Sequence, residues 1–204
     1  MKQWGIPKPS EYLSPEEIRV IIQGAVRERD RLFLETLWQS AARLQEVLAL
    51  TPEWIGENSL ILPNLKQRVS RGSMKEPVVS KELCMMLKLW VRSNKIPEGC
   101  PVFGGNRNPR KKLEASYAWR LVTRISGNAG IFRKKKDKRG KVGFRPAWVH
   151  LFRHSSAMYL LDRSSSTELV QYQLGHSSII TTQAYARIQE LKAKERLMSI
   201  WEGK

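Results

Sequence analysis

The sequence predicts an α+β fold that is mainly α-helical and carries one small antiparallel β-sheet. Apolar residues recur at helical spacing along most of the chain, and strand-like segments occur only between residues 54 and 79. At 204 residues, 41% of them hydrophobic, the chain is long enough for one good-sized core, and no repeat or low-complexity linker divides it. We therefore expect one domain over residues 13–187, preceded by a tail (residues 1–12) and followed by a helical tail (residues 188–204).

Two helices are predicted at the start of this domain. The first begins at Ser14, because a serine followed by proline, with Glu17 three residues on, forms a capping box. An amphipathic pattern supports this helix to about residue 27. A second helix is expected over about residues 31–50 and ends before Pro52.

The middle of the chain is predicted to form the sheet. Strands are expected at residues 54–55, 59–62 and 77–79. The polar stretch from Asn64 to Lys75 connects the last two strands, and we interpret it as a hairpin tip.

Helices are predicted over most of the remaining chain. They are expected at residues 80–94, 114–126, 147–162, 167–174 and 178–187. Gly175 follows the fourth of these segments and is the expected C-terminal stop, since glycine accepts the left-handed backbone that ends many helices.

The chain is strongly basic, with 36 Lys and Arg against 19 Asp and Glu and a net charge of +17. Such a surface favours polyanionic partners, and nucleic acid more than membranes. A run between two predicted helices holds seven cations against one anion, and we interpret it as a mobile loop that contacts DNA backbone phosphates. Its cations are Arg133, Lys134, Lys135, Lys136, Lys138, Arg139 and Lys141.

Several other classes of protein are disfavoured by the sequence. No run of about 18 apolar residues is present, so no membrane partner is expected. Cys84 and Cys100 have no recognisable spacing and are expected to be reduced thiols in a cytoplasmic protein. The three aspartates are far apart, and the cysteines and histidines do not match a zinc site. We therefore expect neither a metal ion nor a cofactor.

All three histidines of the chain fall between residues 150 and 176, and Tyr185 follows the last by nine residues. Arginine binds phosphate oxygens, histidine transfers protons near neutral pH, and tyrosine can be a covalent nucleophile. In a basic chain this cluster indicates chemistry on a phosphate. Farther upstream, Arg43 lies in an apolar helical segment with Glu46 one turn away, which predicts either a solvated ion pair or a phosphate-binding arginine oriented by Glu46.

Three motifs in this order resemble those of the tyrosine recombinases, the phage and transposon integrases. The first is Ala42-Arg43-Leu44-Gln45-Glu46 with its Leu-rich ending, although alanines stand before Arg43 where the family often has a glycine-containing turn. The second is His150-Leu151-Phe152-Arg153-His154, and the third runs without a gap from Leu174 to Tyr185. The resemblance covers about residue 14 to the C-terminus and implies the family's catalytic domain.

The resemblance also implies the roles of the site residues. Arg43, Arg153 and His176 would bind the non-bridging oxygens of a DNA phosphate. Tyr185 would attack the phosphorus, forming a 3′-phosphotyrosyl link and releasing a 5′-hydroxyl without metal or ATP.

A lysine at the hairpin tip would protonate the leaving 5′-oxygen. Lys66 is our choice for this acid, and Lys75 is the competitor because it lies nearer the second strand. His150 would assist proton transfer or brace the phosphate, and Glu46 would support Arg43. His154 has an ordinary explanation as a buried helix residue and is left out of the catalytic set.

The expected function is therefore site-specific recombination or integration of double-stranded DNA. A homo-tetramer on two DNA duplexes is expected, with a monomer possible without DNA, in the cytoplasm or nucleoid of a bacterial, archaeal or phage-encoded system. A catalytically silent DNA-binding regulator and a type IB topoisomerase-like relaxing enzyme are the alternatives. Many members of the family carry a separate N-terminal clamp domain, whereas about a dozen residues precede the domain here. We therefore expect either a catalytic fragment or a short recombinase of the fimbrial inversion-switch type. The C-terminal tail could dock in cis or in trans.

Overall fold

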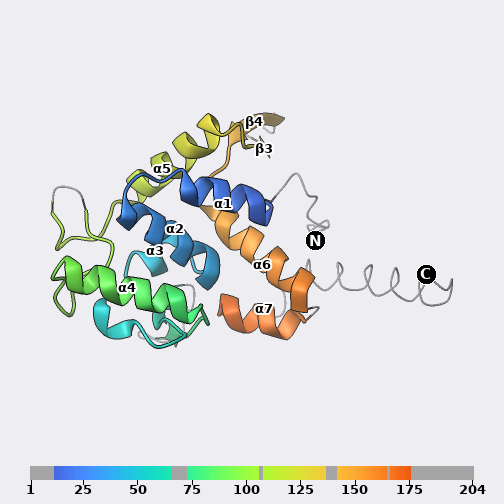
Figure 1. The fold of residues 1–204 in the computed structure, drawn as a ribbon. Helices are drawn as coiled ribbons and strands as arrows, with labels where there is room; N and C mark the ends of the chain where they lie inside the picture. The colour runs from blue at the N-terminus through green and yellow to red at the C-terminus, as the bar shows by residue number, and fades with distance from the viewer. Residues whose placement is uncertain (1–11, 66–72, 106–107, 137–141, 165, 176–204) are drawn as a thin grey trace.

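The computed structural model describes residues 12–65, 73–105, 108–136, 142–164 and 166–175. Within these ranges the fold is mostly helical with two small antiparallel sheets (Figure 1). The predicted fold class is confirmed, although one sheet was expected. The elements in chain order are α1 (Pro15–Gln23), α2 (Glu28–Ser40), α3 (Leu44–Val47), a 3₁₀ turn (Pro52–Trp54), β1 (Leu62–Pro63), β2 (Met74–Lys75), α4 (Lys81–Ser93), α5 (Ala115–Asn128), β3 (Phe132–Lys136), β4 (Val142–Pro146), α6 (His150–Ser164) and α7 (Thr167–Leu174).

Helix α2 lies at the centre of the fold and packs against α1, α3, α4 and α6. Its Phe33 meets Phe103 edge to face with 5.4 Å between the ring centroids, inside the main apolar core. A second, smaller cluster packs α6 and α7 against Ala41. The apolar contacts of α2 therefore place its C-terminal end between the main core and the α6–α7 pair. None of the described helices is long and apolar enough to cross a membrane.

The predicted helix boundaries are confirmed where capping residues define them. Ser14 and Glu17 form the expected capping box, with the Ser14 N–H donating to Glu17 Oε2 at 2.8 Å and the Glu17 N–H donating to Ser14 Oγ at 3.2 Å. Helices α4, α5 and α7 match their predicted ranges to within two residues. Gly175 ends α7 in the left-handed conformation, with φ of 64°. The helix predicted at 178–187 lies outside the described residues.

The single helix predicted over residues 31–50 is wrong, because the chain bends sharply after Ser40. Ala41 adopts a left-handed conformation with φ of 49° and ψ of 20°, and α3 begins only after Arg43. The hydroxyl of Ser40 accepts a hydrogen bond from the Ala42 N–H at 3.2 Å, which caps the turn. Apolar residues continue at helical spacing through this bend, so periodicity alone does not show it.

The first sheet is smaller than predicted. Trp54 lies in a 3₁₀ turn rather than a strand, and the ladder pairs Leu62 with Lys75 and Pro63 with Met74. Isolated bridges join Ile55 to Leu60 and Ser59 to Val78. The hairpin is confirmed by this pairing, but Met74 and Lys75, which were predicted in its tip, form β2, and the strand predicted at 77–79 is reduced to the bridge at Val78. Residues 66–72 lie outside the described residues.

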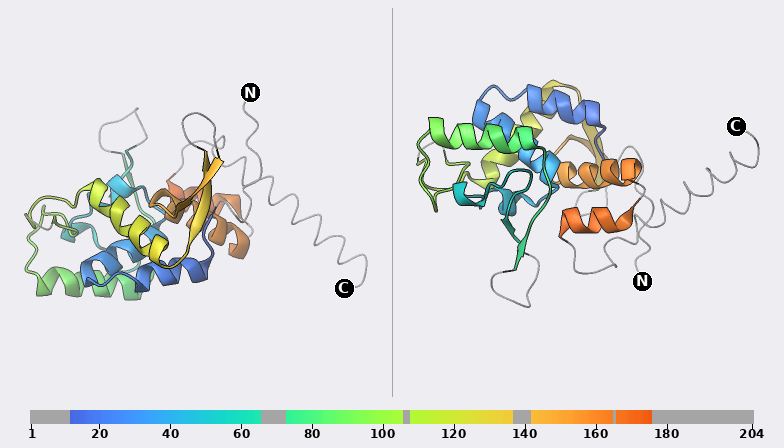
Figure 2. Two further views of the ribbon diagram at one scale, coloured as in Figure 1. Left: turned by 90° about the horizontal axis from the view of Figure 1, so that it is seen from above. Right: turned by 60° about the horizontal axis from the view of Figure 1, so that its bottom comes forward.

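The first residues of the basic run, from Arg133 to Lys136, belong to strand β3 of a second hairpin, so the prediction of a mobile loop is wrong for them. Strand β3 pairs antiparallel with β4 from Phe132 opposite Pro146 to Lys136 opposite Val142. Lysine-rich composition masked this strand, because charged residues are depleted in strands and favour loops. The left view of Figure 2 shows the β1–β2 and β3–β4 hairpins extending to the same side of the helical body.

Candidate active site

The bend after α2 brings Arg43 to the start of α3, where Glu46 holds it. The Glu46 side chain is fully buried and accepts from the Arg43 N–H at 2.8 Å and from Arg43 Nη1 at 2.8 Å. The Arg43 side chain remains 24% exposed. The buried Glu46 carboxylate therefore holds the Arg43 guanidinium from the protein interior, and the exposed part of the guanidinium can contact a ligand.

Lys75 of β2 binds the same carboxylate from the hairpin side. Its Nζ forms an ion pair with Glu46 Oε2 at 2.7 Å, and its side chain is 4% exposed. Burial would raise the pKa of the Glu46 carboxyl, but the charge of Lys75 and hydrogen bonds from Lys75 and Arg43 outweigh it and hold that pKa below its ordinary value. Glu46 is therefore an anion shared by two cations.

Lys75 itself is an unusually acidic lysine. Burial is the main cause that lowers its pKa from 10.5 to about 8, and the positive charges of Arg153 and Arg43 lower it further. Glu46 opposes this shift by favouring the ammonium form. Arg43, Lys75 and Arg153 thus carry more positive charge than Glu46 neutralises, which suits an anionic ligand.

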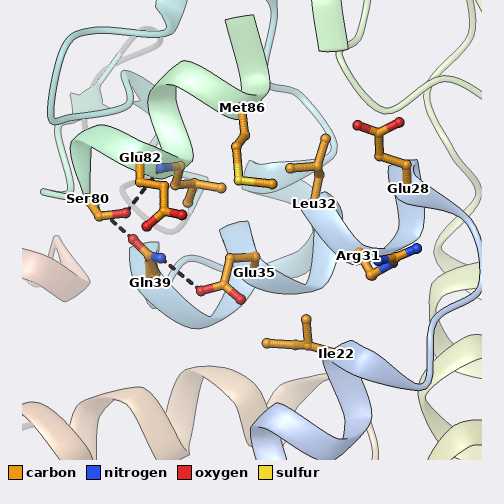
Figure 3. Close-up of a pocket in the computed structure, with 10 residues that line it drawn as sticks. Ile22, Glu28, Arg31, Leu32, Glu35, Gln39, Ser80, Glu82 and Met86 are labelled. Carbon is orange, nitrogen blue, oxygen red and sulfur yellow. Dashed lines mark hydrogen bonds between the residues drawn. The ribbon is translucent and has the colours of Figure 1, made fainter. Parts of the chain in front are cut away.

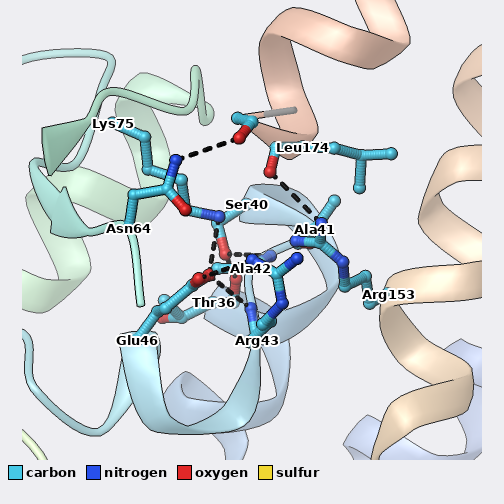
Figure 4. Close-up of polar contacts among 11 residues, drawn as sticks. Thr36, Ser40, Ala41, Ala42, Arg43, Glu46, Asn64, Lys75, Arg153 and Leu174 are labelled. Carbon is cyan, nitrogen blue, oxygen red and sulfur yellow. Dashed lines mark hydrogen bonds and ion pairs between the residues drawn. The ribbon is translucent and has the colours of Figure 1, made fainter. Parts of the chain in front are cut away.

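Arg153 joins the site from the first turn of α6. Its Nη1 donates to the Ala41 carbonyl at 2.7 Å, and its Nη2 donates to the Leu174 carbonyl at 3.2 Å (Figure 4). Through these bonds one half-buried guanidinium connects the left-handed bend before Arg43 with the end of α7.

The structure places Arg43, Glu46, Lys75 and Arg153 close together (Figure 4). The sequence left Lys75 open as the competitor of Lys66 for the role of the acid. His150 is exposed and is the first residue of α6, three residues before Arg153 on the same helix. Lys66, His176 and Tyr185 lie outside the described residues. Among the described residues, no group of three or more His, Cys, Asp or Glu is arranged to hold a metal ion.

His154 packs against the N-terminal segment. Its ring meets the Tyr12 ring edge on, with 6.3 Å between the centroids, and the residue is half-buried. This ring contact supports a structural role for His154.

Of the predicted DNA-contacting cations, Arg133 is used inside the protein. It is 9% exposed, forms an ion pair with Glu17, and donates to the Tyr12 carbonyl at 2.9 Å. Lys134 is exposed and lies 5.8 Å from the centroid of the Phe144 ring. Lys135 and Lys136 belong to strand β3, whereas Lys138, Arg139 and Lys141 lie outside the described residues.

Sequence reasoning missed Asn64, whose side-chain amide donates to the Gly175 carbonyl at 3.0 Å. It also missed Gln173, which donates to the carbonyls of Gln39 and Val78 and accepts from the Val78 N–H. These bonds span 95 to 134 residues of sequence, and no local pattern marks them.

A groove of about 520 Å³ lies apart from this site, between α1, α2 and α4. Figure 3 shows Ile22, Leu32 and Met86 facing the same hollow. Carboxylates line it as well, in contrast to the basic overall charge of the chain: Glu28, Glu35 and Glu82.

Comparison with known proteins gives concordant similarities. The model of the phage integrase family matches residues 11–192. Tyrosine recombinase XerA of Pyrococcus horikoshii is 26% identical over 200 residues, which cover 97% of this chain and 64% of XerA. Tyrosine recombinase XerD of Pseudomonas putida is 29% identical over 214 residues, covering 95% of this chain and 64% of XerD. The chain therefore spans just under two thirds of the length of these relatives.

Solved structures show the same fold. The crystal structure of XerA recombinase matches with a TM-score of 0.69 at 20% identity, covering 95% of this chain and 66% of that chain. A lambda integrase dimer bound to a COC′ core site matches with a TM-score of 0.63 at 19% identity, covering 85% of this chain and 47% of that chain.

Proposed function

Because the chain belongs to the phage integrase family, we propose that it is a site-specific DNA recombinase that cleaves and rejoins strands through a covalent 3′-phosphotyrosyl intermediate. The observation that carries this proposal is the buried carboxylate of Glu46, which holds Arg43 and Lys75 close to Arg153. Such a cluster stabilises the charge that develops on a phosphodiester under attack.

The proposed cleavage step exchanges one phosphate ester for another. The phenolic oxygen of Tyr185 forms a bond to the scissile phosphorus, and the bond from phosphorus to the 5′-oxygen breaks. The phenol loses a proton, and the departing 5′-oxygen gains one. In the reverse step a 5′-hydroxyl of the same or another strand attacks the phosphotyrosine, so rejoining requires neither ATP nor a metal.

Arg43 and Arg153 are proposed to bind the non-bridging oxygens, and His176 to donate a further hydrogen bond. His150 is proposed to assist proton transfer, since its exposed position at the start of α6 lies one helical turn from Arg153. An imidazole there can exchange protons near neutral pH.

Lys66 is proposed as the acid that protonates the 5′-oxygen, while Lys75 braces Glu46. The burial of Lys75 and its ion pair with Glu46 support this division, because a proton donor must reach the DNA. The alternative is that Lys75 is the acid, since a lysine with a pKa of about 8 donates protons readily near neutral pH.

A 5′-bridging phosphorothiolate substrate decides between the two lysines, because a thiolate leaves without a proton. Lys66→Ala should cleave the ordinary substrate slowly and the thiolate substrate at the parental rate. Rescue of Lys75→Ala alone would assign the acid to Lys75.

Double-stranded DNA is proposed to lie against the side from which both hairpins extend. Exposed Lys134 and Arg145 of the second hairpin support backbone contacts there. Since such contacts release counterions, DNA affinity should fall steeply as salt concentration rises.

We further propose a homo-tetramer on two duplexes, in which the C-terminal tail of one copy docks into the groove between α1, α2 and α4 of another. The tail combines apolar Leu191, Leu197 and Trp201 with Lys192 and Lys194, and the groove combines apolar and acidic side chains. Truncation after residue 187 should leave a monomeric complex on DNA by light scattering. A tetramer that persists would exclude this docking.

The function is tested by covalent capture on DNA. The probe is a pool of nicked duplexes with a random central sequence, incubated at low salt. The parent should form an adduct that survives denaturant and is destroyed by protease, whereas Tyr185→Phe should form none. An adduct of equal yield with Tyr185→Phe would overturn the nucleophile, and no adduct with the parent would favour a silent regulator. Adducts without sequence preference, together with relaxation of supercoiled plasmid, would indicate a topoisomerase-like activity.

A further inference from the structure

The β1–β2 hairpin is fastened to the end of α7 by a side chain that the sequence does not single out. Asn64 follows β1 directly, is 9% exposed, and donates from Nδ2 to the Gly175 carbonyl at 3.0 Å (Figure 4). Its own N–H donates to the Ser73 carbonyl at 2.8 Å, across the hairpin. The ladder therefore fixes the backbone of Asn64, and Asn64 in turn holds Gly175.

Two further contacts join the same elements. A Cβ atom added to Gly175 would lie 2.7 Å from Cδ of Lys75, so the aliphatic part of Lys75 packs directly on this glycine. Gln173, two residues before Gly175 in α7, exchanges hydrogen bonds with both main-chain groups of Val78. The hairpin and the segment that follows it therefore contact the end of α7 at two positions, Gln173 and Gly175.

The Gly175 carbonyl that Asn64 holds belongs to the peptide group that links Gly175 to His176. A peptide group is planar, so fixing the direction of the Gly175 carbonyl fixes the plane in which the chain leaves α7. Left-handed glycine is conformationally permissive and does not define that plane unaided. The two proposed catalytic residues that follow in sequence are His176 and Tyr185.

We propose that Asn64 is a positioning residue for strand cleavage, which sets the direction of the chain toward Tyr185 and couples it to the lysine hairpin. This inference rests on the proposed recombinase function. The nucleophile and the proposed acid act on opposite sides of one phosphorus atom, and the Asn64 hydrogen bond helps to keep their two segments aligned with Arg43 and Arg153. Misplacement of a reacting group by about 1 Å can cost on the order of 100-fold in rate.

The test compares Asn64→Leu, which removes the amide at similar size, with Asn64→Asp, which keeps the shape but cannot donate when ionised. Asn94→Leu is the matched control, because the Asn94 amide also donates to a helix-end carbonyl, that of Trp90 at 2.9 Å, far along the chain from the site. Three quantities are measured: the single-turnover cleavage rate at saturating DNA, the half-saturating DNA concentration, and the melting temperature. The DNA is the duplex recovered by covalent capture with the parent.

Both Asn64 variants should cleave about 10- to 100-fold more slowly than the parent, with unchanged half-saturating DNA concentration. The 5′-bridging thiolate should not restore the rate, because a better leaving group does not correct a displaced nucleophile. A parental cleavage rate, a loss that the thiolate fully repairs, or a loss explained by weaker DNA binding would each overturn the inference.

Amide hydrogen exchange without DNA gives a readout that does not depend on the proposed function. Peptides that cover residues 174–186 should exchange faster in Asn64→Leu than in the parent or Asn94→Leu, while α2 and α6 keep parental exchange. Equal exchange in all three proteins would overturn the inference even if the parent cleaves DNA. Failure of the parent to form any adduct would instead count against the recombinase function.

Discussion

Arg43 and Arg133 are each paired with a glutamate, but the glutamate is the more buried partner in the first pair and the arginine is the more buried partner in the second. At Arg43 the carboxylate is fully buried and the arginine is 24% exposed, whereas at Arg133 the arginine side chain is 10% exposed and Glu17 is 30% exposed. A buried carboxylate under a partly open arginine presents positive charge to a ligand. A buried arginine under an open carboxylate ties two segments of the protein together. Which partner of the ion pair is buried therefore distinguishes an arginine that can bind a ligand from an arginine with a structural role.

The largest effect that tests this contrast is on cleavage. Arg43→Ala should lower the cleavage rate by about 10²- to 10³-fold, because one preformed donor to the phosphate is lost. Arg133→Ala should leave cleavage unchanged and instead lower the free energy of unfolding by about 1 to 3 kcal/mol, through lost charge-assisted hydrogen bonds. Single-turnover cleavage and urea denaturation measure the two quantities. Equal cleavage by the two variants would break the comparison.

For the two glutamates we expect the order of the stability losses to be reversed, with the larger loss at Glu46 in the Arg43 pair. Glu46→Gln leaves Lys75 buried without its counter-charge and should destabilise the fold by about 3 to 5 kcal/mol. Glu17→Gln removes a partly exposed ion pair but keeps a glutamine that can complete the capping box, so its cost should be at most about 1 kcal/mol. Urea denaturation of both variants at neutral pH checks this order. Similar losses would show that burial does not rank the pairs.

The lowered pKa of Lys75 should make the stability of the protein depend on pH. Its pKa is about 8 in the folded protein against 10.5 for an ordinary lysine, so between these values the unfolded chain binds more protons. The unfolding free energy of the parent, relative to Lys75→Met, should therefore rise from pH 8 to 10.5, by on the order of 3 kcal/mol. Below pH 8 the full penalty for the buried ammonium is present. A relative stability that falls over this window would mean that the ion pair with Glu46 outweighs burial.

The sequence predicted best what local chemistry determines. The capping box at Ser14 and the glycine stop at Gly175 mark helix ends by short-range hydrogen bonding, and both are confirmed. The motif around Arg43 and Glu46 also predicted their contact, since residues three apart in a helical turn are neighbours.

What the sequence did not predict depends on long-range partners. Arg133 meets Glu17 across 116 positions, and Asn64 meets Gly175 across 111, so neither appears in any local pattern. The basic run looked like a loop because its cations hid the strand pairing with β4. The break before Arg43 was missed because its left-handed residue is alanine, whereas glycine is the residue that normally signals such a turn.

That left-handed alanine gives the smallest of the expected effects. Ala41 and Lys95 both have φ of 49°, a conformation that costs a non-glycine residue about 1 to 2 kcal/mol. Lys95 is exposed, so Lys95→Gly relieves this strain and loses no packing. Ala41 is fully buried between α6 and α7, and Ala41→Gly also gives up a methyl contact of about 0.8 kcal/mol.

Glycine also gives the unfolded chain more conformational freedom, which costs the folded state about 0.5 to 1 kcal/mol. Lys95→Gly should therefore leave the free energy of unfolding unchanged or raise it slightly. Ala41→Gly should give a lower value than Lys95→Gly, and the difference should equal the lost methyl contact. Thermal unfolding of both variants measures this difference. The bend must also keep the Ala41 carbonyl at the Arg153 guanidinium, so cleavage by Ala41→Gly reports whether the site needs the strain or only the shape. Parental cleavage would mean that shape suffices and that Glu46, rather than the strained alanine, holds Arg43 in place. Slower cleavage at parental stability would assign part of that role to the rigidity of Ala41.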